Sequence, residues 1–528
     1  MPSISEYDYI IVGAGSAGCV LANRLSLDPQ VRVLLLEAGQ PDKKREIHIP
    51  AAWSRVLQTP YDWNYMTEPQ PQLDNRQLYW PRGKTLGGSS SINAMIYIRG
   101  NPWDYDHWAE LGCDGWSYED VLPYFKRSEH QIRGEDQYHG VHGPLSVSDP
   151  LSPNPMTVAF TRAAQAAGMP YREDFNTDTQ DGVGLYQTTT LNGKRHSVAK
   201  AFLVPALGRP NLTVLTGAHA ARICFEGRRA TGVTYMRYRQ RREARAAREV
   251  ILCGGAINTP QLLMLSGIGP ADHLRDMGVT IVANLPGVGQ NLQDHLITGI
   301  GVHSPRPVSL ANAERPRDVL RYLMTGRGTL RSNGAEGGAF LRVHDDAPAP
   351  DVQFHFLPIF IYNHGLTRLA GHGFALGVTG LRPESRGWIQ LRANDPFIHP
   401  VIQPNYLQAD ADLQLLLDGM RRARDIIYQD AMRPYRGAEF IPGFAIQSDD
   451  ELRAYIRWQA QTIYHPVGTC KMGTDAASVV TPTLEVRGVE RLRVADASIM
   501  PTITTGNTNA PTLMIGEKAS DLILGMVR

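Results

Sequence analysis

The sequence is poor in cysteine, and its cysteines form no recognisable pattern. Only five of the 528 residues are cysteine (Cys19, Cys113, Cys224, Cys253 and Cys470), and no two are spaced as C-x-x-C. An odd and scattered set argues against both a disulfide framework and a zinc site. We therefore expect a reducing compartment and no bound metal.

The sequence also lacks a long apolar run, an excess of one charge and any low-complexity tract or internal repeat. No stretch of about 18 uninterrupted apolar residues occurs, which predicts no transmembrane helix. No basic and apolar leader precedes the first expected strand, so we expect no secretory signal. The formal net charge is +1, which excludes an obvious nucleic-acid partner. These features predict a cytoplasmic protein and leave peripheral contact with the inner membrane open.

The length exceeds what one compact core accommodates, so two domains, either of which can be discontinuous, are expected. The composition, with 42% hydrophobic and 20% charged residues, is that of a globular protein.

The N-terminal forty residues predict a βαβ unit. A β-branched and aromatic run at 7–12 leads into the turn G-x-G-x-x-G (Gly13, Gly15, Gly18), an amphipathic helix, a second apolar run at 31–36 and then Glu37. Glycines at these positions allow a tight turn, close approach of a pyrophosphate and close packing of helix on strand. Glu37 follows Gly18 by 19 residues, where a carboxylate accepts hydrogen bonds from ribose hydroxyls. This stretch predicts a dinucleotide site, and by itself it allows FAD or NAD.

Two later segments have the same glycine-rich character. Residues 81–94 (PRGKTLGGSSSINA) place small and hydroxylated residues after two cations, which suits an anion or a flat ring, although a plain glycine turn explains them equally well. Residues 249–253 predict a buried strand that runs into a glycine turn and a helix ending at Gly267. The arginine-rich stretch 237–248 has the charge to bind an anion, but the glutamates that interrupt it favour the solvated end of a β-hairpin.

The region between about 300 and 455 predicts a different kind of sheet. Apolar residues alternate with polar ones at 352–356 and 374–378, and 388–391 predicts a further strand, as in an antiparallel sheet with one covered face. A long helix is predicted over 413–427, and shorter helices over 117–126, 156–167 and 514–524.

Four separated motifs together resemble the glucose–methanol–choline (GMC) oxidoreductases. They are the N-terminal βαβ unit, residues 83–93, residues 255–269, and His465 with Asn509. WPRGKTLGGSSSINAMIYIRG and YHPVGTCKMG most resemble choline-dehydrogenase-like alcohol dehydrogenases. The resemblance implies an α/β fold with a Rossmann-type FAD-binding domain and a discontinuous α+β substrate domain containing a mostly antiparallel sheet. It assigns residues 1–150, 195–300 and 461–528 to the first domain, with 151–194 as an excursion into the second and 301–460 as its main part.

The resemblance also implies the cofactor and its contacts. FAD is expected, and Ile92 stands where some family members carry the histidine that attaches it, so binding should be noncovalent. Residues 83–93 would lie along the pyrophosphate and flavin, Ala220 would contact adenine, and Asp496 and Ala497 would lie near the ribityl chain. The expected cofactor-binding residues are Gly13, Gly15, Ser16, Ala17, Gly18, Glu37, Ala38, Arg82, Gly83, Leu86, Gly87, Ser89, Ser90, Asn93, Ala94, Ala220, Asp496, Ala497, Asn509 and Thr512.

The implied reaction is oxidation of a primary alcohol to an aldehyde by hydride transfer to flavin N5. His465 would take the hydroxyl proton, because histidine titrates near neutrality, and Asn509 would hydrogen-bond the same oxygen. The electrons would pass to a quinone or another carrier; oxygen, as in an oxidase, is the alternative. His355 and His372 are expected to be structural or merely to line the pocket.

Other functions within the resemblance are a hydroxynitrile lyase, a fatty-acid photodecarboxylase and a non-catalytic flavoprotein. The presence of both His465 and Asn509 argues against them. A choline substrate would need a carboxylate or an aromatic cage, for which Glu336 and Trp53 are candidates. The aromatic strand around 352–360 instead favours an apolar pocket for aliphatic or benzylic alcohols.

Overall fold

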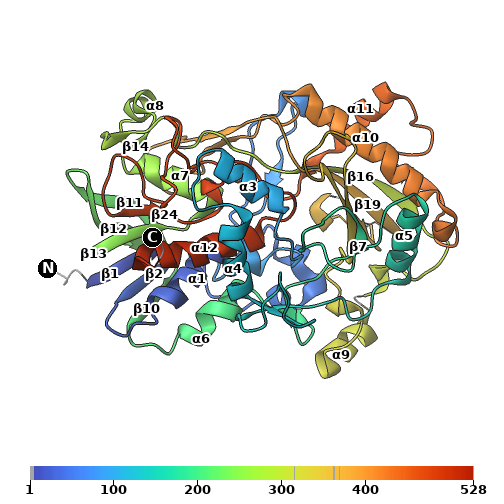
Figure 1. Ribbon diagram of the computed structural model, residues 1–528, viewed down its shortest axis with the longest axis horizontal. Coiled ribbons are helices and arrows are strands. Elements are labelled where there is room, and N and C mark those ends of the chain that lie inside the picture. The colour runs from blue at the N-terminus through green and yellow to red at the C-terminus, as the bar shows by residue number, and fades with distance from the viewer. Residues whose placement is uncertain (1–4, 314, 361–362, 368, 527–528) are drawn as a thin grey trace.

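The protein, seen in a computed structural model that describes residues 5–526 except 314, 361–362 and 368, is built on two sheets (Figure 1). One sheet lies with the chain termini and the other lies beyond it with α5, α10 and α11. The helices are α1 (Ser16–Leu25), α2 (Arg45–His48), α3 (Pro102–Glu110), α4 (Tyr118–Ser128), α5 (Pro155–Ala166), α6 (Val204–Ala206), α7 (Gly255–Leu265), α8 (Ala271–Asp276), α9 (Pro316–Thr325), α10 (Asp410–Ile427), α11 (Asp449–Gln459) and α12 (Asn509–Leu524).

The first sheet has seven strands in the order β10-β2-β1-β13-β12-β11, with β24 pairing to β13. Its parallel part joins β10, β2, β1, the end of β13 and β24, and β11 to β13 form an antiparallel meander. Strand β2 is buried along its whole length, as expected for a parallel strand covered on both faces. The bounds are β1 (Ser5–Val12), β2 (Val33–Glu37), β10 (Leu212–Thr216), β11 (Ala218–Glu226), β12 (Arg229–Arg237), β13 (Gln240–Leu252) and β24 (Leu492–Val494).

The structure corrects the strand predicted at 249–253. It is the end of β13, a single strand that begins at Gln240 and includes most of the arginine-rich stretch. The first half of β13 pairs with β12 across a turn at Tyr238 and Arg239, both of which have positive φ. The arginines alternate with buried Ala244 and Ala246, so they belong to the exposed side of a hairpin, as predicted.

The second sheet is antiparallel, in the order β22-β16-β19-β18-β17-β7, with β23 also pairing to β16. Together with the parallel sheet this confirms the predicted α/β fold class. The bounds are β7 (Gly182–Leu185), β16 (Leu296–His303), β17 (Gly337–Leu341), β18 (Val352–Leu357), β19 (Gly373–Gly380), β22 (Glu439–Ile441) and β23 (Gln461–Thr462). β7 comes from the predicted excursion at 151–194; the domain boundaries themselves stay a prediction.

The two faces of the second sheet differ. α10 packs on one face, where Phe354 and Phe356 are fully buried and Phe356 stacks on Phe160 of α5 (ring centroids 4.7 Å apart). The opposite face carries Gly299, Gly301 and Gly377, which line a cavity, and the side chains of Phe440 and Ile297 lie against Gly301 and Gly377. The aromatic residues of β18 therefore point away from the cavity, contrary to the sequence-based expectation.

The remaining elements are short. They include five two-stranded pairs: β3 (Tyr65–Met66) with β4 (Tyr79–Trp80), β5 (Glu129–Gln131) with β6 (Leu145–Val147), β8 (Thr190–Leu191) with β9 (Lys194–Arg195), β14 (Ile268–Gly269) with β15 (Ala283–Asn284), and β20 (Trp388–Gln390) with β21 (Val401–Gln403). Among the described helices, none has the length and apolar character needed to cross a bilayer.

Candidate functional site

A cavity of about 380 Å³ runs from the glycine-rich turn after β1 to His465 at the second sheet. It brings together most of the residues predicted from the sequence, although they come from distant parts of the chain. The predicted residues that line it are Gly13, Gly15, Ser16, Ala17, Glu37, Ala38, Arg82, Gly83, Ser89, Asn93, Ala94, Ala220, His465, Asp496, Ala497, Asn509 and Thr512.

The turn after β1 leaves the N-terminus of α1 open toward this cavity. Gly13 has φ +105°, and a Cβ added there would lie 2.5 Å from the carbonyl oxygen of Cys253, at the end of β13. A Cβ added to Gly15 would meet only that oxygen, at 3.9 Å, and one added to Gly255 would meet nothing within 4 Å. The N-cap of α1 makes no side-chain hydrogen bond and its first turn holds no acidic residue. The positive end of the helix and the open space before it fit a pyrophosphate, and so they fit a dinucleotide such as FAD.

Two carboxylates flank this end of the cavity. Glu37 accepts hydrogen bonds from the N–H groups of Ala14 (2.9 Å) and Gly39 (2.7 Å). Burial raises its pKa to about 7. Asp496 accepts hydrogen bonds from the Gly255 N–H (2.8 Å) and the Thr259 hydroxyl (2.6 Å). Both side chains therefore tie together the turns that would surround a dinucleotide.

Four predicted cofactor-binding residues do not line the cavity: Gly18, Leu86, Gly87 and Ser90. Gly18 instead allows α1 to pack on β1, because a Cβ there would lie 1.9 Å from the Gly13 carbonyl oxygen. The other three hold the loop 83–93 in place. Leu86 N–H donates to Gln40 O (3.4 Å), Gly87 N–H donates to Ala14 O (2.7 Å), and Ser90 Oγ donates to Gly87 O (2.8 Å).

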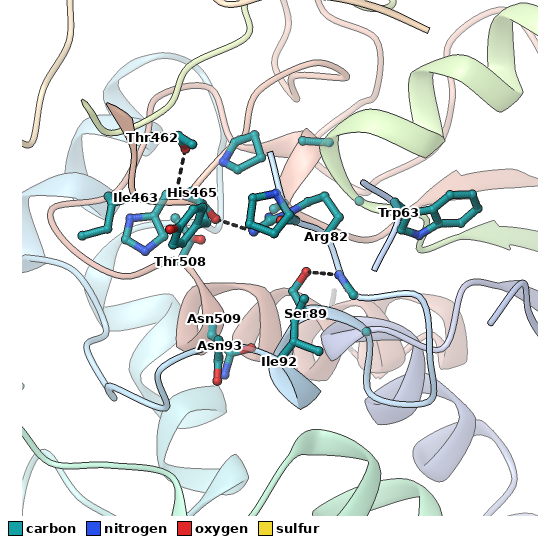
Figure 2. Close-up of a pocket in the computed structure, with 18 of the residues that line it drawn as sticks. Trp63, Arg82, Ser89, Ile92, Asn93, Thr462, Ile463, His465, Thr508 and Asn509 are labelled. Atoms are coloured by element: carbon teal, nitrogen blue, oxygen red, sulfur yellow. Dashed lines mark hydrogen bonds between the residues drawn. The ribbon is translucent and has the colours of Figure 1, made fainter. Parts of the chain in front are cut away.

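His465 lies at the opposite end, in the turn that follows β23. The backbone N–H of His465 donates to Asp294 Oδ1 (2.7 Å). The other carboxylate oxygen of Asp294 accepts from Thr462 Oγ1 (2.6 Å) and from the Tyr406 hydroxyl. Burial raises the pKa of Asp294 to about 6. Arg82 donates to the carbonyl oxygen of Tyr464 (2.6 Å), the residue before His465 (Figure 2). The backbone of this turn is thus fixed on both sides.

The hydrogen bonds of His465 determine which of its ring nitrogens carries the proton. His295 Nε2 must donate to Leu381 O (2.9 Å), because a carbonyl only accepts. Burial lowers the pKa of His295 to about 4, so the ring is neutral and its Nδ1 is an acceptor. His465 Nδ1 lies 3.0 Å away and therefore donates to it. His465 Nε2 is left with a lone pair, which suits a proton acceptor.

The partner of that nitrogen is Asn507, not Asn509. Asn507 Nδ2 lies 3.2 Å from His465 Nε2. Asn509 instead accepts a hydrogen bond from Ser16 Oγ (2.7 Å), at the start of α1, and Figure 2 shows its side chain directed away from His465. Asn509 is the first residue of α12, and the turn before this helix separates the two asparagines. The sequence predicted that Asn509 bonds the same substrate oxygen as His465; in this structure Asn509 lies at the cavity wall near the glycine-rich turn, and the amide beside His465 Nε2 is that of Asn507.

Asn93 is held by a buried arginine that the sequence reasoning did not single out. Arg195 Nη1 donates to Asn93 Oδ1 (2.8 Å) and to Ser90 O (3.1 Å), and its Nε donates to Ile47 O (2.6 Å). Burial lowers the pKa of Arg195 to about 9. The side chain fixes the end of the loop 83–93 beside Ile92, which also lines the cavity.

Several other cavity residues were not predicted. Next to Ala220, the ring of His219 contacts Trp63 (centroids 5.6 Å apart), and Lys84 Nζ lies 4.3 Å from the centre of the Trp63 ring. The aromatic content of residues 40–80 was the only sequence signal for Trp63. His355 lines the cavity, as was considered, whereas His372 bonds Ser309 Oγ (2.7 Å) away from it.

Much of the wall at the end of the cavity around His465 is apolar. Ile297, Leu357, Phe360, Leu369, Phe440 and Ile441 line it, together with the polar residues His355, Gln459, Gln461 and Thr462. Among described residues that line the whole cavity, the only carboxylates are Glu37 and Asp496, at the other end. Glu336 is buried elsewhere and accepts hydrogen bonds from Asn154 N–H (2.7 Å), Thr157 Oγ1 (2.9 Å) and Ser332 Oγ (2.6 Å). Trp53 lines the cavity, but Glu336 does not.

Known proteins resemble this chain over nearly its whole length. Sequence models of the GMC oxidoreductase family match residues 7–297 and 383–516. The chain is 48% identical to a mitochondrial choline dehydrogenase of Mus musculus, covering 98% of this chain and 90% of that protein. It is 46% identical to an alcohol dehydrogenase [acceptor] of Pseudomonas putida (99% and 96% covered) and 49% identical to an oxygen-dependent choline dehydrogenase of Burkholderia multivorans (98% and 94%). Among solved structures, pyridoxine 4-oxidase from Mesorbium loti superposes with a TM-score of 0.90 at 34% identity, covering 97% of this chain and 98% of that one.

Proposed function

Because this chain belongs to the GMC oxidoreductase family and is an FAD-dependent enzyme that oxidises alcohols, we propose that its substrates are uncharged primary alcohols with an apolar chain. The observation that carries this proposal is the lining of the cavity near His465. Aliphatic and aromatic residues make up much of the wall there, and none of the described residues that line it supplies a carboxylate for a cationic substrate. An apolar chain gains free energy on leaving water for such a wall, whereas an unpaired cation loses it.

The chain's own residues would hold the cofactor along the cavity. We propose that backbone N–H groups at the start of α1 face the pyrophosphate, that Glu37 accepts from the ribose, and that Ala220 lies against the adenine. Ser89, Asn93 and Ala94 would lie by the flavin ring. When bound, FAD supplies the acceptor for the hydride that leaves the carbinol carbon.

His465 would act as the base in this reaction. Its Nε2 carries the lone pair needed to accept the hydroxyl proton, and His295 keeps the other nitrogen protonated. Asn507 Nδ2, now 3.2 Å from Nε2, would donate to the same substrate oxygen as negative charge develops on it. An alcohol is a far weaker acid than an imidazolium ion, so proton removal would be coupled to the departure of the hydride.

We propose that the electrons then pass to a quinone or another carrier. The names of the relatives support an acceptor in general, since one is an alcohol dehydrogenase [acceptor] and another is oxygen-dependent. We also propose that FAD is bound noncovalently, because the aliphatic side chain of Ile92 has no group that could bond to a flavin.

The test is an anaerobic absorbance titration of the purified, FAD-loaded enzyme. Octanol and benzyl alcohol are expected to bleach the oxidised-flavin band, and choline is expected to do so far less at equal concentration. Readmitting air then distinguishes an oxidase, which recovers its colour at once, from a dehydrogenase, which needs an added quinone. Bleaching by choline alone would overturn the substrate proposal, and a lack of bleaching by any alcohol would favour a lyase or photoenzyme.

Choline is the second candidate substrate. It is named for two of the relatives, and Trp53, Phe360, Phe440 and Tyr464 line the cavity and could face a quaternary ammonium. The same titration decides between the two candidates.

A further inference from the structure

Helix α9 (Pro316–Thr325) presents an apolar stripe to solvent. Leu320 is 57% exposed, Leu323 is 59% exposed and Met324 is 75% exposed. Spacings of three and four residues place these side chains on one side of the helix. Figure 1 shows α9 at the edge of the molecule, projecting from the part that holds the second sheet.

The opposite side of α9 is anchored, so the stripe belongs to a fixed surface and not to a loosely attached segment. Tyr322 is buried in a small apolar cluster with Leu310, Ala313 and Leu330, and Val319 packs against this cluster. The Tyr322 hydroxyl donates to Gly193 O (2.9 Å), in the turn between β8 and β9. That turn brings a fourth exposed apolar residue, Leu191 (45%), to the same region.

Several exposed cations lie on or near the helix that carries the apolar stripe. Arg315, Arg317, Arg321 and Arg327 are exposed on or beside α9, and Lys194 is exposed in the neighbouring β8–β9 hairpin. The acidic residues of this stretch of sequence are Asp318 and Glu314, of which Glu314 lies outside the described residues. Among the described residues of α9, its flanks and the β8–β9 hairpin, the five exposed cations outnumber the one acid, Asp318, so this surface has a positive balance although the whole chain is nearly neutral.

The same surface adjoins the cavity. The 3₁₀ turn at Thr329–Arg331 packs both against α9 and against the 3₁₀ helix Pro50–Val56. Trp53 of the latter lines the cavity, and its Nε1 donates to Asn333 O (3.1 Å), a residue that lines it too. A surface on which α9 rests would therefore lie close to the apolar end of the cavity.

We propose that α9 docks on the surface of a bilayer that contains anionic lipids. Leucine and methionine side chains would enter the boundary between headgroups and acyl chains, and the arginines would lie at the level of the phosphates. A lipid surface is favoured over a protein partner because the cations match anionic headgroups and because the adjoining cavity is lined for apolar molecules, which partition into membranes. Docking there would let such alcohols reach the cavity from the bilayer.

The test is co-sedimentation of the FAD-loaded enzyme with vesicles of phosphatidylcholine, with and without phosphatidylglycerol. The wild-type enzyme is expected to pellet with the anionic vesicles and to be released by salt. The triple variant Leu320→Ser, Leu323→Ser, Met324→Ser is expected to bind the anionic vesicles at least about tenfold more weakly than the wild type does. Arg317→Gln and Arg321→Gln are each expected to weaken binding to the anionic vesicles by about fivefold.

The matched control is Leu27→Ser, which changes a leucine with the same 59% exposure just after α1 and should bind as the wild type does. FAD content and reduction by alcohol with a water-soluble dye as acceptor report that each variant is folded. Because the experiment measures vesicle binding, its result does not depend on whether the proposed substrate class is right. A wild-type enzyme that stays in solution, or a triple variant that pellets like the wild type, would overturn the proposal. So would loss of a dimer in the triple variant without any vesicle binding, which would make α9 a contact with a second copy.

Discussion

His295 Nδ1 lies 3.0 Å from His465 Nδ1, with the two rings nearly perpendicular at 84°. This contact leaves the proton of His465 on Nδ1 and the lone pair on Nε2. We expect His295→Leu to remove the acceptor, to allow the wrong tautomer and to slow anaerobic flavin reduction by about tenfold or more. His295→Gln, whose amide oxygen can accept the Nδ1 proton, should recover part of the rate. If His295→Leu and His295→Gln reduced the flavin at the same rate, at unchanged FAD content, His295 would not position the base.

The base itself is tested by His465→Ala. The variant should keep its FAD, because the residues expected at the pyrophosphate lie at the other end of the cavity. Reduction of the flavin by alcohol should fall by about 10²-fold or more, measured by stopped-flow absorbance under anaerobic conditions. A variant reduced at a near-normal rate would remove His465 from this role.

The two asparagines before and at the start of α12 should differ in effect. Asn507→Ala removes the group that bonds His465 Nε2, and we expect flavin reduction to slow by about 10²-fold with FAD still bound. Asn509→Ala removes the acceptor for Ser16 Oγ at the glycine-rich turn, and we expect mainly weaker FAD retention. The measurements are the reduction rate and the FAD-to-protein ratio after gel filtration. The reverse pattern would restore Asn509 as the partner of His465.

The rate of flavin reduction should decline in acid at a pH below the ordinary pKa range of histidine. Burial, together with His295, His355 and Arg82 nearby, holds the pKa of His465 well below its usual 6.5. A lowered pKa keeps the base neutral as the pH falls, so the rate of flavin reduction should stay level through about pH 6.5 and decline only at lower pH. The check is the pH dependence of the anaerobic reduction rate. A decline centred at or above 6.5 would contradict this expectation.

The noncovalent attachment of FAD has a simple readout. When the protein is precipitated with acid, all of the flavin absorbance should appear in the supernatant, because Ile92 offers no atom for a covalent bond. A yellow pellet that survives washing would require another attachment site. Boiled protein analysed by mass spectrometry, which should show the mass of the unmodified chain, serves as the control.

Local patterns in the sequence predicted the first strand, α1 and the second strand, because hydrophobic period and glycine spacing act over a few residues. The extension of β13 back to Gln240 was missed, since the arginine-rich half of that strand is held by pairing with β12 and not by its own composition. The direction of Phe354 and Phe356 was missed for a similar reason. Period-two alternation distinguishes the two faces of a strand, but only the distant helix α10 determines which face is covered.

The candidate site was predictable where a motif carried it and not where the contact is long-range. Glu37 follows from its spacing to the glycine turn. His295 lies 170 residues before His465 and carries no motif that points to it. Asn507 and Asn509 are two residues apart in the same GNTN stretch, and the sequence alone offers no means of choosing between them. The backbone turn before α12 makes that choice.

Gly301, a glycine of the second sheet at the cavity wall, bears on how substrate preference diverges among relatives. Gly301 lies under the ring of Phe440, where an added Cβ would come within 2.8 Å of the ring. Phe440 occupies a register irregularity of β22, and such a bulge directs one side chain out of the regular alternation. A single methyl group at position 301 would thus displace an aromatic ring that borders the space for the alcohol. The depth of that space is adjustable by one mutation that leaves His465 and the FAD-binding turns untouched.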